Sequence, residues 1–197
     1  MATSLQADKA YDHYLRTLLR PFRLKSAVAK QYGLTHSQVH SSEWELFGAV
    51  LLDMRGSSHT YGADLVSAEV KSTRIGGAGT FEYQYHRDSW QAKLTEDAHI
   101  SHLFVLYSAD YENLEVYILR ADQVHNTILG WKPLALAAYP PHTTGGRCRP
   151  GISVGFVKAH GRLVLRISGG LLKSYDSTPL SSLLASPRCQ RPGCAPA

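Results

Sequence analysis

One short segment of the sequence, residues 62–72, places two carboxylates and a lysine among small apolar stretches. Residues 65–66 and 68–70 are apolar enough to form strands, so we expect a short β-hairpin here. Side chains alternate between the two faces along a strand, which should turn Glu69 and Lys71 to one face and the residue between them into the core. The segment therefore predicts a hairpin that gathers charged side chains beside a hydrophobic core.

The spacing of these charged residues points to metal-dependent chemistry. Asp64 precedes the second strand, where the hairpin should bring its carboxylate beside that of Glu69. Two converging carboxylates repel each other unless a hard cation joins them, and Mg²⁺ binds one or two protein carboxylates together with substrate phosphate and water. Lys71 would add a positive charge beside the reacting phosphorus. The pattern predicts hydrolysis of a phosphodiester by a metal-bound water, although aspartate, glutamate and lysine at this spacing also occur on solvated hairpins.

The composition of the 197 residues fits one globular domain with a sizeable core. Hydrophobic residues make up 44% and charged residues 19%, which excludes a largely disordered chain. A formal net charge of +5 favours an anionic partner. We find no apolar run of membrane-spanning length and no signal-peptide pattern at residues 1–8, so we expect no membrane partner and a cytoplasmic location.

The cysteines and histidines do not have the spacing of a structural zinc site. Cys148, Cys189 and Cys194 are odd in number and offer no second ligand pair, so we expect reduced thiols. His99 and His102, three residues apart, are expected at the surface or at a strand end.

Apolar periodicity and turn residues predict helices first and strands afterwards. Helices are expected at 6–19, 24–32, 42–55, 89–96 and 122–129. Pro21 should end the first helix, a capping box from Ser42 to Glu45 should open the third, and Asp88 should cap the fourth. The expected strands are 80–86, 103–107 and 114–119, with an irregular stretch up to Pro150 and a closing hairpin of 152–157 and 163–167.

This order predicts an α/β fold with a mixed β-sheet flanked by helices. We expect residues 1–42 to form an N-terminal helical segment at a dimer interface and residues 43–170 to form a nuclease core with DNA-recognition strands. Residues 171–197, rich in serine, proline, glycine and cysteine, should form a poorly ordered C-terminal extension.

Several further segments occur in an order that is typical of one enzyme family. They are the helix at 46–52, Ala68-Glu69-Val70-Lys71-Ser72, the aromatic and histidine segment 81–86, the strands at 103–107 and 116–122, and Pro-x-Ile-x-Val-x-Phe-Val-x-x-His-Gly at 150–161. On these residues the chain, from about Glu43 to Ile167, resembles the small homodimeric type II restriction endonucleases of the PD-(D/E)xK nuclease superfamily. It departs from their pattern in having no proline before Asp64.

The resemblance implies a restriction-endonuclease-like core and a specific set of catalytic residues. Asp64 and Glu69 would be Mg²⁺ ligands, with the carbonyl of Val70 as a further ligand. Lys71 would position the attacking water and help to deprotonate it. Glu43 or Glu45 could add a third carboxylate to the metal site, but capping and first-turn roles in their helix explain both residues more simply.

The resemblance also implies two strands that contact DNA. Gln84, Tyr85 and His86 fall on the family's histidine cluster, where only the last position keeps a histidine. Cys148 and Arg149 fall where the family presents two asparagines to base edges. An arginine in the major groove most often reads guanine, so Arg149, with Arg147, is our candidate guanine reader, and Gln84 could pair with adenine. Phosphate contact or simple solvation is the alternative for both arginines.

Together these features predict a Mg²⁺-dependent type II restriction endonuclease. It would cut double-stranded DNA as a homodimer at a short palindromic site, with blunt ends that carry 5′-phosphates and 3′-hydroxyls, beside a companion DNA methyltransferase. One alternative is a structure- or mismatch-specific repair or junction nuclease with the same catalytic residues. Another is a non-enzymatic DNA-binding protein, because Ala29 to Val39 has helix-turn-helix spacing.

Overall fold

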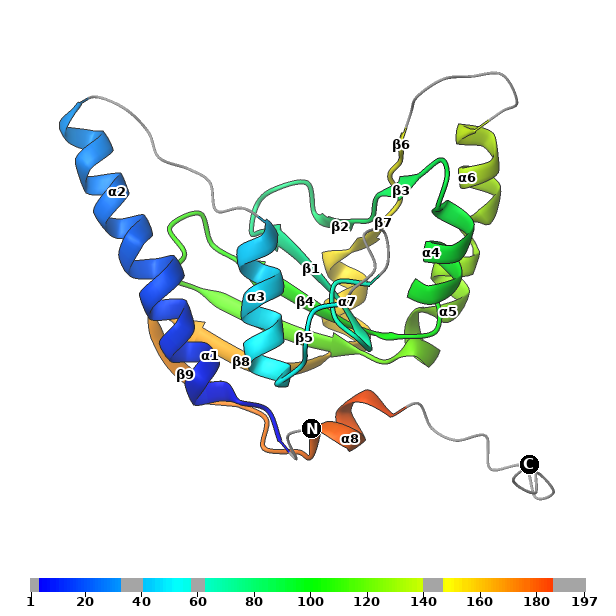
Figure 1. Ribbon diagram of the computed structural model, residues 1–197. Coiled ribbons are helices and arrows are strands. Elements are labelled where there is room, and N and C mark those ends of the chain that lie inside the picture. The colour runs from blue at the N-terminus through cyan, green and yellow to red at the C-terminus, as the bar shows by residue number, and fades with distance from the viewer. Residues whose placement is uncertain (1–3, 33–40, 58–62, 140–146, 186–197) are drawn as a thin grey trace.

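The computed structural model describes residues 4–32, 41–57, 63–139 and 147–185. They form a mixed α/β fold in which a five-stranded sheet lies between two groups of helices (Figure 1). The helical elements are α1 (Ala7–His13), the π-helix η1 (Tyr14–Leu19), α2 (Arg20–Gln31), α3 (Ser41–Leu52), α4 (Trp90–Asp97), α5 (Ala121–Leu129), α6 (Lys132–Ala138), α7 (Val154–His160) and α8 (Leu180–Leu184). The strands are β1 (Ala68–Arg74), β2 (Thr80–Glu82), β3 (Tyr85–His86), β4 (Ser101–Tyr107), β5 (Leu114–Leu119), β6 (Arg147–Cys148), β7 (Gly151–Ser153), β8 (Arg162–Ser168) and β9 (Leu171–Tyr175).

The large sheet has the strand order β1-β4-β5-β8-β9. Strand β1 runs parallel to β4, and the remaining neighbours are antiparallel. Strands β2 and β3 leave this sheet and pair instead with β7 and β6 in two short antiparallel ribbons. The strand that carries the predicted catalytic residues is therefore an edge strand, with one side open to other groups.

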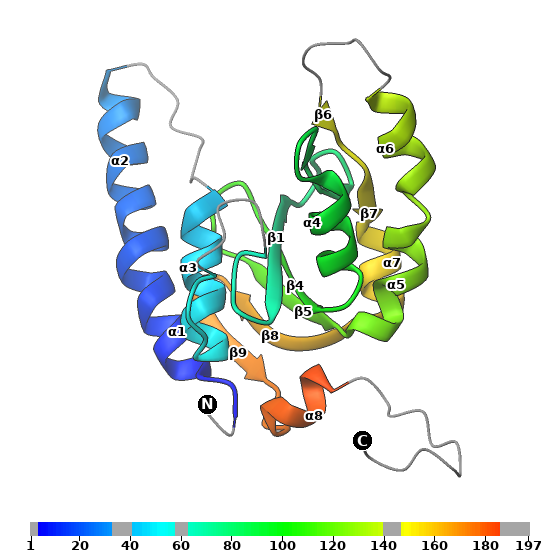
Figure 2. The ribbon, with the colours of Figure 1, turned by 45° about the vertical axis from the view of Figure 1, so that its right-hand side comes forward.

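Alternating side chains on the strands build a hydrophobic core on each face of the sheet. On β4, Leu103 and Val105 pack under α1, η1 and α3, whereas Phe104 and Leu106 pack under α4, α5 and α7. Figure 2 shows these two groups of helices on opposite sides of the sheet. The predicted mixed sheet flanked by helices is confirmed.

The N-terminal helices form one continuous run, so the prediction that Pro21 ends the first helix is wrong. Helix α2 continues from Arg20 through Pro21. Proline has no N–H to donate and its ring crowds the carbonyl four residues earlier. The six residues of η1 make wider π-helical turns immediately before Pro21, which accommodates this defect.

Helix α3 lies very close to β1 because of a glycine. A Cβ atom at Gly48 would lie 2.8 Å from Val70 Cγ2 and 3.0 Å from Leu103 Cδ2. Ser42 lies inside α3, so it is not the residue that caps this helix as predicted. Residues 33–40, which include most of the possible helix-turn-helix segment, lie outside the described residues.

The expected closing hairpin at 152–167 is wrong, because residues 154–160 form helix α7. Ser153 is its N-cap, and its Oγ accepts a hydrogen bond from the backbone N–H of Phe156 at 3.0 Å. Val157 is buried in the core on that face of the sheet. Alternating apolar residues in this short segment fit either structure, and the cap together with the burial of Val157 favours the helix.

Three other expectations also need correction. Residues 132–138 form α6 where an irregular stretch was expected, and the expected strand 80–86 is split into β2 and β3. Ser89, not Asp88, precedes α4 as its N-cap. Residues 171–184, expected to be poorly ordered, contain β9, which pairs with β8, and α8, which buries Leu180 and Leu183.

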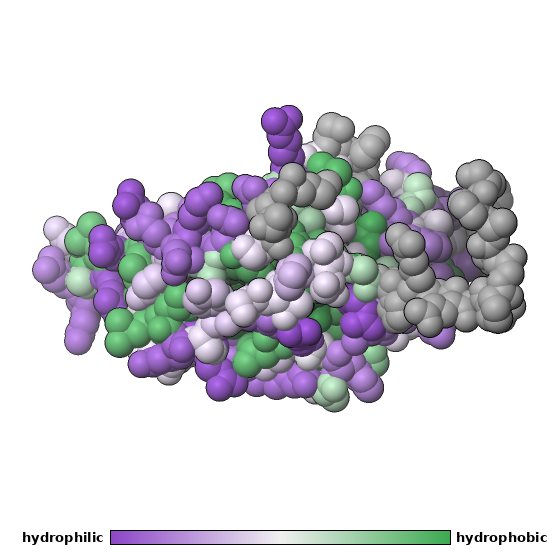
Figure 3. Space-filling model, turned by 90° about the horizontal axis from the view of Figure 1, so that it is seen from below, coloured by the Kyte–Doolittle hydropathy of each residue, from purple (hydrophilic) through white to green (hydrophobic). Residues whose placement is uncertain are grey.

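The surface is mostly polar on the side where both ends of the described chain lie. Hydrophilic residues cover much of this face, with hydrophobic residues interspersed between them (Figure 3). None of the helices in the described part of the chain is long and apolar enough to cross a membrane.

Candidate active site

Two carboxylates are locked together at the open edge of β1. The backbone N–H of Asp64 donates to Glu69 Oε2 at 3.0 Å, and the backbone N–H of Val70 donates to Asp64 Oδ2 at 3.0 Å. The intervening chain makes a tight turn, closed by a hydrogen bond from Leu65 N–H to the carbonyl of Ala68. The predicted strand at 65–66 is thus a turn in which Leu65 makes isolated bridges with Gly56 and Ala68, yet it brings the two carboxylates together as expected.

Lys71 is the third predicted catalytic residue, and it lies with both carboxylates. Its ammonium contacts Glu69 Oε1 closely and lies 3.9 Å from Asp64 Oδ2. It also lies over the ring of Tyr83, 5.2 Å from the centroid. Val70 points into the opposite core, so the predicted alternation of side chains along this strand is confirmed.

A second lysine, which sequence reasoning missed, contacts the same glutamate. Lys93 on α4 places its Nζ 3.1 Å from Glu69 Oε1 and 3.1 Å from Asp97 Oδ1. Glu69 and Asp97 have fully buried side chains. The available signal was the four-residue spacing of Lys93 and Asp97, which on a helix usually describes a surface ion pair.

Aromatic residues and a histidine form hydrogen bonds on the buried side of this charged cluster. The Tyr85 hydroxyl donates to Asp97 Oδ2 at 3.0 Å. His102 is fully buried. Its Nε2 lies 2.7 Å from the Asp97 carbonyl and donates to it, because a carbonyl oxygen can only accept. In a neutral imidazole the other nitrogen is then the acceptor, so Nδ1 accepts from the Tyr83 hydroxyl at 2.8 Å. Of the two expected roles for His102, the strand-end position is confirmed, because β4 begins at Ser101, and the surface position is wrong, because the side chain is fully buried. The register of β1 and β4 places it beside Glu69.

Burial and neighbouring charges set the protonation of Asp64 and Glu69. Burial, followed by repulsion from Glu69, raises the pKa of Asp64 to about 7. Burial alone would raise the pKa of Glu69 as well, but Lys71 and Lys93 outweigh it and hold that pKa below its usual value. In the absence of a cation, Glu69 carries the negative charge of the pair and Asp64 holds a proton near neutral pH.

The groups around the lysines are shifted for the same reasons. Burial, followed by repulsion from Glu69, raises the pKa of Asp97 to about 6. Burial lowers the pKa of His102 to about 4, which keeps its imidazole neutral. The pKa of Lys93 is raised, because attraction to its two carboxylates outweighs burial. Strongly shifted pKa values in one cluster are typical of functional sites.

The oxygen donors at this edge fit Mg²⁺. The Val70 N–H bonds to Asp64 and not to β4, and the N–H and C=O of one residue in a strand point to the same side. The Val70 carbonyl therefore also faces the open edge of β1. Among the described residues, no three histidine, cysteine, aspartate or glutamate side chains form a metal cage. A Mg²⁺ ion does not need one, because it keeps several waters and binds one or two carboxylates.

A pocket of about 340 Å³ opens over the cluster. Asp64, Glu69, Lys71 and Lys93 lie on its wall, and Glu45 from α3 lies there as well. Repulsion from Glu45 contributes to the raised pKa of Asp64. The alternative that Glu45 adds a third carboxylate to the site is therefore consistent with its position.

The two predicted DNA-contacting segments lie side by side at the rim of this pocket. Strand β3 pairs with β6, so that His86 lies opposite Arg147. Arg147 Nη1 donates to Gln84 Oε1 at 3.1 Å, and Arg149 lies 3.4 Å from Glu82 Oε1. Gln84, Arg147 and Arg149 are exposed, and Glu82, Gln84 and His86 line the pocket itself. Segments more than 60 residues apart in sequence are thus joined beside the carboxylates.

Two predicted DNA-contacting residues point the wrong way. The side chains of Tyr85 and Cys148 are buried in the core, where they face each other across the β3–β6 ribbon. The Tyr139 hydroxyl donates to the Tyr85 carbonyl and accepts from the Cys148 N–H, so their backbone groups are engaged too. The prediction that they contact bases is corrected to a structural role, because strand alternation turns every second side chain inward.

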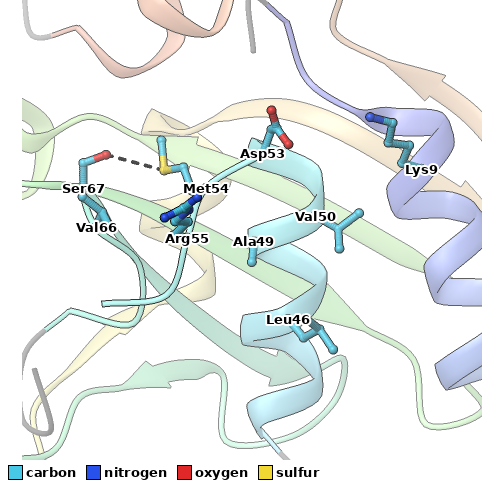
Figure 4. A pocket seen from close by; sticks show the side chains of 9 residues that line it. All are labelled: Lys9, Leu46, Ala49, Val50, Asp53, Met54, Arg55, Val66 and Ser67. Carbon is cyan, nitrogen blue, oxygen red and sulfur yellow. Dashed lines mark hydrogen bonds between the residues drawn. The ribbon is translucent and has the colours of Figure 1, made fainter. Parts of the chain in front are cut away.

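A second pocket lies on the outer face of α3 (Figure 4). Its wall is largely apolar and includes Leu46, Val50, Met54 and Val66, with the Ser67 hydroxyl donating to Met54 Sδ. Leu46 is 50% exposed. This pocket lacks the paired carboxylates of the β1 site.

We compared the chain with models of known protein families and with curated proteins, and neither comparison found a match.

Proposed function

We propose that this protein is a Mg²⁺-dependent endonuclease of the PD-(D/E)xK type that cleaves double-stranded DNA at a short palindromic site. The observation that carries the proposal is the cluster of Asp64, Glu69 and Lys71 at an open sheet edge, with exposed polar side chains of β3 and β6 at its rim. The net charge of +5 supports a polyanionic substrate.

Asp64, Glu69 and the carbonyl of Val70 would hold the metal ion. When bound, Mg²⁺ would polarise the scissile phosphate and make a neighbouring water more acidic. Loss of the Asp64 proton precedes binding, because the ligand has to be a carboxylate. The reciprocal hydrogen bonds through the two backbone N–H groups hold both carboxylates in place before any ion arrives.

Lys71 would act on the reacting phosphate. Its ammonium side chain is 17% exposed and reaches the pocket, where it orients the attacking water and neutralises charge on the non-bridging oxygens. A water oxygen forms a bond to phosphorus in line with the bond to O3′, which breaks, and O3′ takes up a proton. The products are a 5′-phosphate and a 3′-hydroxyl, and the proposed cleavage leaves blunt ends.

The rim residues would read the sequence of the DNA. Arg147 and Arg149 are exposed on one short ribbon with Gln84, so a base pair in the major groove could meet a guanidinium and an amide together. Their present partners, Gln84 and Glu82, orient the arginine side chains along the rim.

A homodimer would cut both strands of a palindrome, since one site cuts one strand. Helix α2 supports this part of the proposal. The helix and its C-cap residue carry an exposed apolar stripe at intervals of four residues, with Leu24 68%, Val28 47% and, at the C-cap, Tyr32 76% exposed. Sedimentation of Leu24→Asp/Val28→Asp beside the natural chain tests it: the natural chain should be a dimer and the variant a monomer.

Digestion of methylated and unmethylated plasmid and phage DNA, with Mg²⁺ and with EDTA, tests the activity. Discrete fragments that need Mg²⁺ are expected, and sequencing of their ends gives the recognition site and the stagger. Cleavage confined to mismatched or branched DNA would favour a repair or junction nuclease. DNA binding with no cleavage of any substrate would defeat the proposal.

A further inference from the structure

Lys93 reaches from α4 across the pocket floor to the catalytic strand. Its Nζ lies 3.1 Å from Glu69 Oε1 and 3.1 Å from Asp97 Oδ1, and its side chain is only 11% exposed. Both carboxylates are fully buried. An ammonium group this far from water is retained only where carboxylates compensate its charge, and Lys93 has one on each side.

The contacts of Asp97 fix the position of Lys93. Asp97 lies one turn further along α4, and its second oxygen accepts from the Tyr85 hydroxyl at 3.0 Å. The Asp97 carbonyl accepts from His102 at 2.7 Å. These contacts hold Lys93 against Glu69, so its charge lies at a defined place in the site.

The oxygens of Glu69 are already divided between partners. Oε1 contacts both Lys71 and Lys93, and Oε2 accepts from the N–H of Asp64. In two-metal sites the ions lie about 3.5–4 Å apart, and a carboxylate between them has to offer an oxygen to each. Here one side of Glu69 faces two ammonium groups, and a second divalent cation on that side would be strongly repelled.

We propose that Lys93 is a positioning residue that takes the place of a second divalent cation, so that each chain binds one Mg²⁺ on the Asp64 side of Glu69. The inference deepens the proposed nuclease function and rests on it. Lys93 supplies a fixed positive charge behind Glu69 and keeps that carboxylate turned toward the metal-binding edge, while Lys71 serves the reacting phosphate.

Titration of the full-length chain with Mn²⁺, with free Mn²⁺ followed by its electron paramagnetic resonance signal, tests this without DNA. The natural chain should bind one ion. Lys93→Met removes the charge and keeps the length of the side chain, so a second ion should bind. Lys93→Arg should restore a stoichiometry of one. Lys158→Met makes the same change in charge at an exposed lysine paired with Glu115, and should leave one ion.

Cleavage kinetics give a second readout. Lys93→Met should lower kcat at least tenfold with little change in KM for DNA, because the role proposed for Lys93 is to hold Glu69 and not to bind DNA. Lys93→Arg should recover most of the loss. If circular dichroism shows that Lys93→Met does not fold, Lys93→Gln, which retains a hydrogen-bond donor, replaces it in both experiments with the same expected results.

The outcomes separate this inference from the proposed function. Two ions on the natural chain, or one ion and unchanged kcat in Lys93→Met, would overturn the role of Lys93 while Mg²⁺-dependent cleavage still stands. A natural chain that binds no ion and cleaves no DNA would overturn both.

Discussion

The backbone N–H of Asp64 donates to Glu69 Oε2, and this 3.0 Å hydrogen bond ties together the two acidic residues that the sequence separates by five positions. The N–H of Val70 returns the interaction by donating to Asp64 Oδ2. Each carboxylate is therefore oriented by the chain segment that carries the other. A substitution at either position should disturb both, and their effects on metal binding should not be additive.

Removal of the Glu69 carboxylate should destabilise the fold as well as abolish cleavage. Glu69→Ala leaves Lys71 and Lys93 buried beside each other without their shared counter-charge, which should cost about 3–5 kcal/mol. Urea unfolding measures the loss. Glu82→Ala, at an exposed glutamate on the rim, should change the stability by less than about 0.5 kcal/mol. Equal stability of Glu69→Ala and the natural chain would contradict the buried cluster.

Asp64→Asn should stabilise the metal-free protein more at pH 8 than at pH 5. The pKa of Asp64 is raised to about 7 in the fold, so the folded state binds this proton more tightly than the unfolded chain does. The resulting stability is present below pH 3.8 and is lost as the pH rises to about 7. An asparagine avoids this loss and should raise the free energy of unfolding at pH 8 by roughly 1–3 kcal/mol. This figure includes a reduction for solvent screening, because the pocket is open on one side.

Thermal unfolding of both proteins at pH 5 and pH 8, with and without Ca²⁺, measures this dependence. Ca²⁺ should raise the Tm of the natural chain at pH 8 much more than at pH 5, because the proton and the ion compete for Asp64. The Tm of Asp64→Asn should respond weakly at both values. A destabilised Asp64→Asn at pH 8 would argue against the raised pKa.

Arg149→Ala should relax the choice of DNA sequence while cleavage continues. A bidentate contact of arginine with guanine discriminates by about 1–3 kcal/mol, so related sites should be cut at rates closer to that of the preferred site. Arg166→Ala removes an exposed arginine on β8, away from the rim, and serves as the control. If Arg149→Ala weakens binding equally for all sequences, Arg149 contacts phosphate instead.

Ser153→Ala tests whether residues 154–160 are helical. The Ser153 hydroxyl accepts from the N–H of Phe156, and loss of such a cap costs about 1 kcal/mol. Ser153→Asp retains an acceptor and should keep the stability near that of the natural chain. Equal stability of the alanine and natural proteins in urea would argue against the cap and favour a strand.

Strand β1 shows how much of the structure local sequence patterns can predict. Alternation alone predicted that Val70 enters the core while Glu69 and Lys71 share the other face, and the structure confirms both. Long apolar runs were equally reliable, since the strands predicted at 103–107 and 114–119 match β4 and β5 within two residues. In each case one local period leaves few alternatives.

Other features depend on contacts between distant segments. Residues 154–160 fit a strand or a helix by pattern, and the burial of Val157 against the sheet selects the helix. Strand β9 has little hydrophobic signal, and its pairing with β8 orders it. Alternation along 81–86 is consistent with the inward side chain of Tyr85, whereas its pairing with Cys148 across the β3–β6 ribbon depends on a contact between distant segments.

The sequence by itself determined the identity and the shared face of the acidic and basic residues on β1, because side-chain alternation is a property of a single strand. Only the tertiary structure decided what surrounds them. Lys93 contacts Glu69 from 24 residues away, and Arg147 contacts Gln84 from 63 residues away. Those contacts arise where α4 and the β3–β6 ribbon pack around the edge of the sheet, and the charges and pKa values of the site follow from the burial that this packing imposes.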